Sequence, residues 1–381
     1  MSRANINLNN FFPSPGGVIG EGITCDICHK VIGVTLDDNG YPYADQPGIL
    51  SFQYPSFNLN NPRISFGPLP SYITKNEPNH ANGCFPIYSE SSFCAACHYG
   101  RFHGVLIYSS YSEWMRSPYS KKKIDAEGNK KKENPGYRSC QDCHMLSPEQ
   151  IGNSLPSQRE ACSAVNESFN NFNHNMMLIN GVSLIKDAAK LEVKLEGGEN
   201  TNSIKITVKV TNIKAGHNFP TDSPLRHLIL VVEAKDEQGN LLPQADGEKI
   251  PVWGGVGVDP NVTGMTNYGG MPGKIFANLL VDIDTNISPT AAYWNPIKLA
   301  MANPAKGTDS DTRLKPNKTD ESNYTFTLPA RGEAYITLKL VYRYAFIDLA
   351  RQKGWYRPDF DAALKECPPI DVKQPETWEC P

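Results

Sequence analysis

Long apolar runs are missing from this sequence of 381 residues. No stretch approaches the roughly 18–20 consecutive apolar residues that a membrane-spanning helix needs, so we expect no membrane span. The first ten residues, Met1 to Asn10, contain no apolar core of a signal peptide either. An internal repeat with a period of about 20–50 residues is also missing, which argues against a solenoid.

Charge of one sign is not in excess. The 37 Lys and Arg residues nearly balance the 40 Asp and Glu residues, and the formal net charge of −3 gives no reason to expect nucleic acid as a partner. Apolar residues make up only 39% of the chain, which is low for a large self-sufficient core. The 30 Gly and 30 Pro residues predict frequent turns and much irregular or β structure.

Cysteine and histidine recur together in one pattern. Cys-x-x-Cys-His occurs three times, at Cys25/Cys28/His29, Cys94/Cys97/His98 and Cys140/Cys143/His144. Covalent haem attachment requires this pattern, because two thiols add to the two vinyl groups of one porphyrin and the following His reaches the iron. We therefore predict three covalently bound haem c groups, each with the motif histidine as its proximal ligand.

Zinc is the alternative occupant of Cys-x-x-Cys pairs. A Cys₄ zinc site needs an even number of pairs, whereas this chain has three, and zinc gives no reason for a histidine after every second cysteine. Haem is therefore the preferred interpretation. Since haem attachment at this pattern normally follows export, we expect that a leader preceded the sequence numbered here.

Five histidines lie outside the motifs and are candidates for the sixth iron position. Five candidates for three positions favour bis-histidine, low-spin iron, the state suited to electron transfer. We expect His80, His174 and His217 to be these distal ligands; His217 lies in a glycine-containing turn in which the backbone can approach a flat ligand. His103 is a further candidate, whereas His227 begins a predicted strand and is interpreted as an ordinary structural residue. Methionine ligation is the alternative, although a thioether more often only packs on the ring, and the methionines concerned are Met145, Met176 and Met177.

The organisation along the chain predicts an α+β protein. Residues 1–184 hold every haem motif, and we expect a triheme cytochrome c domain of loops and short helices packed around the cofactors. The best helix candidate there is Tyr108 to Tyr119, ended by Ser117-Pro118 because the residue before proline disfavours the α region.

From about residue 185 the apolar period changes to alternation, which predicts an antiparallel β-sandwich over residues 185–350. A short helical tail is expected over 351–381. The expected strands include Leu191–Leu195, Ile204–Val210, His227–Ala234 and Tyr335–Tyr342, with a turn at Asp236–Asn240, and the expected helices lie near Ala345–Lys353 and Asp359–Glu366.

Several segments carry a resemblance to a known family. They are Gly22–Lys30, Pro78–His80, Phe93–His98, Tyr111–Tyr119, Cys140–Met145, Gly216–Thr221, Asp311–Leu314 and Leu340–Arg343. In this order they are similar to exported multihaem c-type cytochromes of bacteria and archaea, some of which polymerise into extracellular filaments. The resemblance also implies that His80, His174 and His217 are distal ligands. Some relatives carry four or more haems, so the count of three is a point of difference.

Four cysteines belong to no haem motif. In an oxidising compartment an even number of leftover cysteines predicts two disulfides, and three pairings are possible. We favour Cys367 with Cys380, which closes a short tail loop, and Cys84 with Cys162, which ties the haem-binding half together.

The combined expectation is electron transfer without a catalytic site of its own. We expect an exported protein at the cell surface or outside the cell that forms a polymeric conduit, with other copies of itself and redox partner proteins or extracellular acceptors as partners. A discrete periplasmic or surface shuttle is the alternative, followed by a redox enzyme with one open iron position. A third hypothesis is that the sandwich is an adhesion or carbohydrate-binding module that carries the haem-binding half. Ligation of iron by His217 would argue against it, because the two halves would then form one unit.

Overall fold

The computed structural model describes residues 25–43, 46, 48–55, 63–68, 72–73, 80–120, 136–145, 184–186, 188–197, 202–257, 264–290, 292–300, 310–354 and 356–381. Contacts divide the described residues into two compact units, one up to Ala96 and one from Cys97 onward. This division is defined by contacts between residues and does not test the domain limits that we expect at residues 184 and 350, so these limits stay predictions. Among the described helices, none combines the length and the apolar character needed to cross a membrane.

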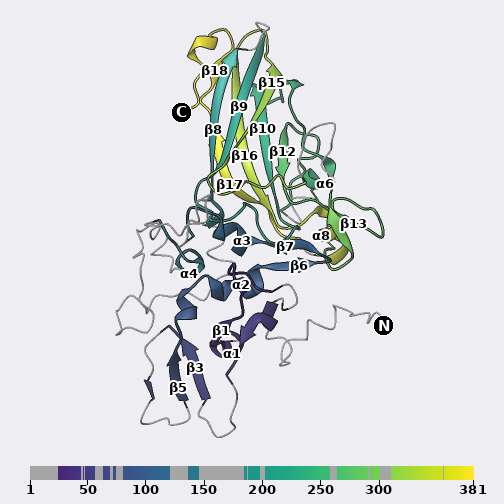
Figure 1. Cartoon of the computed structure of the whole chain (residues 1–381). Coiled ribbons are helices and arrows are strands. Elements are labelled where there is room, and N and C mark those ends of the chain that lie inside the picture. The colour runs from purple at the N-terminus through teal and green to yellow at the C-terminus, as the bar shows by residue number, and fades with distance from the viewer. Residues whose placement is uncertain are drawn as a thin grey trace. The chain divides into compact units, whose positions relative to one another are not determined.

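The second unit contains the predicted antiparallel β-sandwich (Figure 1). One sheet has the strand order β12-β10-β16-β17, with β18 also paired to β16, and the other has the order β11-β15-β9-β8. The strands are β8 (Ala189–Gly197), β9 (Ser203–Asn212), β10 (His227–Asp236), β11 (Gln244–Asp246), β12 (Gly273–Phe276), β15 (Thr319–Thr327), β16 (Glu333–Arg343), β17 (Phe360–Glu366) and β18 (Ile370–Asp371).

The core of the sandwich lies between these two sheets. Alternate residues of β9, such as Ile204 and Ile206, are fully buried against side chains of β10 and β16 such as Leu230 and Leu338. This alternation is the period-two pattern that predicted the strands, because successive side chains of a strand point to opposite faces. The predictions of four strands and of the Asp236–Asn240 turn are confirmed.

Strand β10 is buried on both faces, which explains its continuous apolar run from Leu228 to Val232. Its second face packs against Ile250, Tyr268 and the helix α8 (Ile347–Lys353). At Gly273 of β12 the backbone has a φ of 146°, and a Cβ there would lie 1.9 Å from the carbonyl oxygen of Leu230. Only glycine therefore fits the contact between β12 and β10.

The C-terminal segment corrects one prediction. Helix α8 confirms the expected helix near Ala345–Lys353, but Asp359–Glu366 is not helical: it forms the edge strand β17, paired with β16. Pairing with an existing sheet outweighs the helix preference of Ala, Leu, Lys and Glu. The chain then ends in β18 and the 3₁₀ helix η7 (Pro375–Thr377), and the predicted disulfide between Cys367 and Cys380 is present.

Before the sandwich, the second unit contains a hairpin and short helices. Strands β6 (Gly100–Phe102) and β7 (Val105–Tyr108) precede α3 (Ser110–Met115), and α4 (Cys140–His144) follows. The helix predicted over Tyr108–Tyr119 is therefore present but shorter at both ends. The remaining strands, β13 (Leu280–Asp282) and β14 (Ile297–Leu299), form a separate hairpin, and α6 (Val252–Gly255) is a single turn.

The first unit consists of short elements joined by loops, as expected for this half. It contains α1 (Cys25–His29), the pair β1 (Gly33–Val34) and β2 (Phe52–Gln53), and a small sheet in which β3 and β5 run parallel. The other elements are η3 (Gly48–Ser51), β3 (Arg63–Gly67), β4 (Tyr72–Ile73), β5 (His80–Cys84), η4 (Pro86–Ser89) and α2 (Ser92–His98), and the division between the units falls inside α2.

Candidate haem-binding sites

Each Cys-x-x-Cys-His motif lies on one short helix: the first on α1, the second at the end of α2 and the third on α4. Residues three and four positions apart share one face of a helix, so the second cysteine and the histidine follow the first on the same side of a turn. Cys28, Cys94, Cys97, Cys140 and Cys143 are thiols. This arrangement allows both sulfurs of a motif to bond one flat group while the histidine faces its centre.

Helix α4 shows why the third motif folds locally. Ser139 precedes the helix, and its Oγ accepts a hydrogen bond from the Asp142 amide at 3.1 Å. The Asp142 carboxylate in turn accepts one from the Ser139 amide at 2.8 Å. This capping box satisfies two of the amides that a helix N-terminus leaves unpaired.

The histidine of the third motif lies close to the predicted distal ligand His217. The imidazole rings of His144 and His217 have centroids 6.1 Å apart and planes inclined by 18°. Two imidazoles that bind one metal ion from opposite sides, with metal–nitrogen bonds of about 2 Å, have ring centroids about 6 Å apart.

The loop that carries His217 is held in place by its neighbours. The fully buried Asn212 at the end of β9 donates to the carbonyl oxygen of His217 at 2.9 Å and to that of Leu314 at 3.1 Å. His217 Nδ1 lies 2.9 Å from the carbonyl oxygen of Asn218, to which it can donate, and this leaves Nε2 for a metal. The backbone at Gly216 comes close to aromatic side chains, since a Cβ at this position would lie 3.2 Å from the ring of Tyr119.

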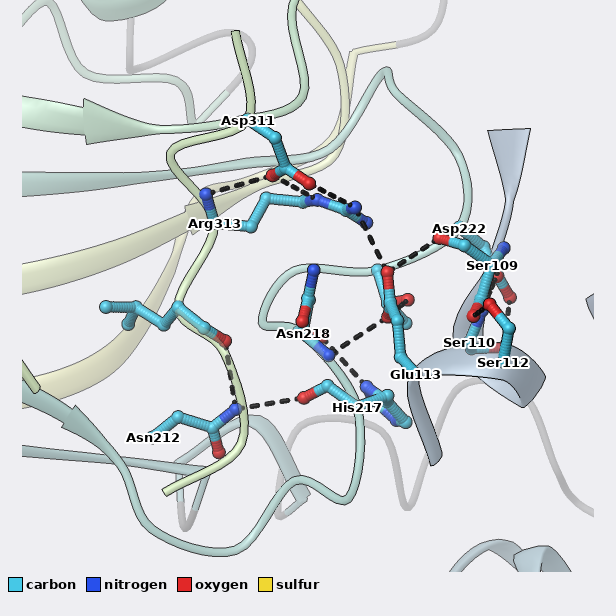
Figure 2. Close-up of polar contacts among 12 residues, drawn as sticks. Ser109, Ser110, Ser112, Glu113, Asn212, His217, Asn218, Asp222, Asp311 and Arg313 are labelled. Carbon is cyan, nitrogen blue, oxygen red and sulfur yellow. Dashed lines mark hydrogen bonds and ion pairs between the residues drawn. The ribbon is translucent and has the colours of Figure 1, made fainter. Parts of the chain in front are cut away.

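A buried carboxylate, Glu113 of α3, ties this loop to the helix (Figure 2). Its Oε2 accepts hydrogen bonds from the Asn218 amide at 3.0 Å and from Thr221 Oγ1 at 2.7 Å. Its Oε1 accepts one from Ser109 Oγ at 2.6 Å and pairs with Arg313 Nη2 at 3.0 Å. Four donors therefore converge on one carboxylate and fix the residues that follow His217.

The second motif is engaged by Asp222, at the end of the same loop. Asp222 Oδ2 lies 2.6 Å from His98 Nδ1, while Oδ1 accepts hydrogen bonds from the amides of Ser109 and Ser110. Burial raises the pKa of Asp222, but the hydrogen bonds from His98 and Ser110 outweigh this effect and lower it. Partial desolvation lowers the pKa of His98, whose side chain stays 52% exposed, but the hydrogen bond and charge of Asp222 reverse this effect, so that the pKa is raised.

The first motif uses a neutral partner. His29 Nδ1 lies 2.6 Å from the carbonyl oxygen of Phe66 in β3, and its ring lies parallel to that of Tyr88 with centroids 5.7 Å apart. The Tyr88 hydroxyl lies 2.7 Å from the carbonyl oxygen of Cys28 and 2.8 Å from that of Val31, so Tyr88 holds the end of α1.

The other predicted ligands have different outcomes. His80 begins β5, and His174 lies outside the described residues, so both stay predictions. His103 has a φ of 49° at the turn of the β6–β7 hairpin, and its Nε2 lies 3.2 Å from the carbonyl oxygen of Trp294. His227 is fully buried against Gly254 and Phe346, in agreement with a structural role.

Sequence reasoning missed Asp222, Glu113 and Asn212 as organisers of these sites. Two of them had a signal nearby: Glu113 lies inside the segment Tyr111–Tyr119, and Asp222 directly follows Gly216–Thr221.

Of the leftover cysteines, Cys84 is also disulfide-bonded, whereas Cys162 lies outside the described residues. In the described part of the chain no group of three or more His, Cys, Asp or Glu residues could hold a bare metal ion.

Comparisons with known proteins identify a structure with a similar fold. No family model matches the sequence, and no curated protein matches it. Among solved structures the chain is similar to a penta-heme cytochrome c552 from Thermochromatium tepidum, with a TM-score of 0.57 and 19% identity. The match covers 92% of this chain and 78% of the other chain. The chain therefore has the fold of a multihaem cytochrome.

The described residues fit a covalently bound haem. Thiols and histidine share one helical turn, and each of His29, His98 and His217 has Nδ1 against an oxygen atom, which leaves Nε2 for the iron. The ring centroids of His144 and His217 lie 6.1 Å apart, a distance compatible with two imidazoles on one iron.

Proposed function

We propose that this chain is an electron-transfer protein with three covalently bound haem c groups. The observation that carries the proposal is the proximity of His217 to His144, 6.1 Å between ring centroids, at one of three Cys-x-x-Cys-His motifs. Two imidazoles on one iron fill both axial positions and keep substrates away from the metal, which suits electron transfer. The multihaem cytochrome fold supports the same proposal.

Each residue has a defined role in this proposal. The six motif cysteines hold the porphyrins, His29, His98 and His144 are proximal ligands, and His217 is the distal ligand at the third motif. His80 and His174 are proposed as distal ligands of the other two irons. Haem bound at these sites would supply one-electron redox centres. The protein itself orients the imidazoles through Phe66, Asp222 and Asn218.

The haem count and the ligation state can be tested on the holoprotein purified from its source or from a cytochrome-maturing host. We expect the intact mass to include three haem groups and the reduced protein to resist carbon monoxide. In His217→Ala we expect one haem of the three to become high-spin and to bind carbon monoxide. The matched control is His103→Ala, which removes an exposed hairpin histidine and should leave all three haems unchanged.

The outcomes separate the alternatives. If His217→Ala kept all three haems six-coordinate, His217 would not be an iron ligand. Binding of carbon monoxide by one haem of the wild-type protein would instead indicate an open iron position and favour a redox enzyme. A mass with no haem in a maturing host would reject the proposal as a whole.

We also propose that the protein is exported and that copies associate head to tail into an extracellular conduit. The disulfide between Cys367 and Cys380 supports an oxidising compartment. Contacts between different surfaces of neighbouring copies generate an open polymer when they do not close into a ring. Apolar side chains exposed around the β13–β14 hairpin support an interaction surface of this kind, and they are Ile283, Ile287, Trp294 and Leu299.

Negative-stain electron microscopy of the haem-loaded protein tests this assembly. We expect regular filaments, and Ile287→Lys should shorten or abolish them without changing the haem spectrum. Discrete particles of one size in the wild-type sample would reject the conduit and favour a discrete periplasmic or surface shuttle.

A further inference from the structure

Asp222 is an unusual partner for a haem-ligating histidine because its surroundings hold it as a buried anion. Its exposed fraction is only 6%, and its backbone has a φ of 56°, in the left-handed region. Besides His98 Nδ1, it accepts hydrogen bonds from the amides of Ser109 and Ser110 at 3.0 and 2.9 Å and from Ser110 Oγ at 2.9 Å. Four donors therefore stabilise its charge and fix its position.

The two other axial histidines with a described Nδ1 partner lack such a charge. His29 faces the carbonyl oxygen of Phe66, and His217 faces that of Asn218. A hydrogen bond to an ionised acceptor is roughly twice as strong as one between neutral groups. The residues that orient the histidine also tune the metal, because a negative acceptor increases the basicity of the imidazole. The second motif therefore has a more electron-donating proximal ligand than the first.

We propose that Asp222 is a positioning residue that sets the reduction potential of the haem at the second motif below the value that a neutral acceptor would give. This inference rests on the proposed function. The carboxylate fixes Nδ1 of His98 as the donor and Nε2 as the iron ligand. Its negative charge favours the ferric state, which carries one more positive charge than the ferrous state. Loss of this charge therefore favours reduction of that haem.

The test is a redox titration of the holoprotein in which the three haems are distinguished by their haem-methyl NMR resonances. In Asp222→Asn we expect the reduction equilibrium of one haem to shift about tenfold toward the ferrous state, which corresponds to about 59 mV for one electron. The other two haems should shift by less than twofold. Asp320→Asn is the matched control, because it removes the same charge from a partner of Lys274 in the sandwich and should move no haem selectively.

A second variant keeps the proposal testable if Asp222→Asn does not fold. Ser110→Ala removes the 2.9 Å donor from the carboxylate oxygen that faces His98, together with a longer 3.3 Å contact of the hydroxyl with His98 Nδ1, so more of the negative charge remains for the imidazole. We expect the same haem to shift in the opposite direction, toward the ferric state, by up to about twofold. A protein with three low-spin haems whose potentials do not respond to either variant would overturn the role of Asp222 but leave the electron-transfer proposal intact. Loss of haem from the wild-type protein would reject the proposed function itself.

Discussion

The substitution Glu113→Gln tests the polar cluster that joins α3 to the loop 216–222. Glutamine has the same shape as glutamate but carries no charge, and one of its two oxygens is replaced by an NH₂ group. If the NH₂ group replaces Oε1, Arg313 Nη2 faces a donor; if it replaces Oε2, the Asn218 amide faces one. In either orientation one buried donor loses an acceptor, and Arg313 keeps its ion pair with Asp311.

The structure allows the size of this effect to be worked out. The exposed side-chain fractions of Arg313 and Glu113 are 6% and 5%, so solvent does not screen the pair or replace the lost bonds. Breaking a buried pair by removal of one partner costs about 3–5 kcal/mol, and a remaining charged partner reduces this to about 3 kcal/mol. For a unit of this size each kcal/mol lowers the melting temperature by roughly 2–4 °C, so we expect a decrease of roughly 6–12 °C.

Urea and thermal denaturation of the holoprotein, followed by far-UV circular dichroism, measure this change. The control is Glu321→Gln, which removes the same charge from an exposed pair with Lys209 at 3.4 Å. Exposed pairs contribute at most about 1 kcal/mol, so the control should unfold almost like the wild type. If Glu113→Gln were also within about 1 kcal/mol of the wild type, the cluster would not stabilise the loop as we infer.

Two further predictions concern the sandwich. Burial, and then the charge of Arg343, lowers the pKa of His227 to about 4 from its usual value near 6.5. Between these values the unfolded chain binds a proton that the folded chain does not, so the free energy of unfolding should fall by up to about 3 kcal/mol as the pH decreases from 6.5 to 4. Urea titrations across this range should show a flatter dependence in His227→Phe, and an unchanged slope would contradict the assignment. In the tail, replacement of both Cys367 and Cys380 by serine opens a loop with a sequence separation of 13 and should lower the free energy of unfolding by about 3 kcal/mol. Denaturation midpoints equal to those of the wild type would show that the bond does not restrict the unfolded chain.

The parts of the fold that the sequence predicted are those with a local pattern. Alternation of apolar and polar residues identified β8 and β9, because one face of each strand is buried in the sandwich, whereas β10 was recognised by an apolar run that both of its buried faces require. The haem motifs could be recognised since their chemistry requires contiguous residues. Segment 359–366 was misinterpreted because its helix-forming residues, such as Ala362 and Leu364, carry no sign of the strand β16 beside them.

The polar organisers of the site could not be found in this way. Glu113 and Asp222 act through partners more than 100 positions away, and a single acidic residue forms no pattern that distinguishes it from a surface carboxylate. The proximity of His144 and His217 likewise depends on the fold, since their separation in the sequence is not constrained by helix or strand geometry. From the sequence we therefore expected His217 to be an iron ligand but could not assign it to one of the three haems.

The long sequence separations of these contacts also bear on how the protein is made. His98 meets Asp222 across 124 positions, and Glu113 meets Asn218 across 105. Contacts between such distant residues form late, because the loop between them must first be closed. Chains are synthesised from the N-terminus, so the second and third Cys-x-x-Cys-His motifs exist before their partners in the sandwich. Asp222 and His217 can therefore complete the surroundings of these two motifs only after the long loops between them have closed.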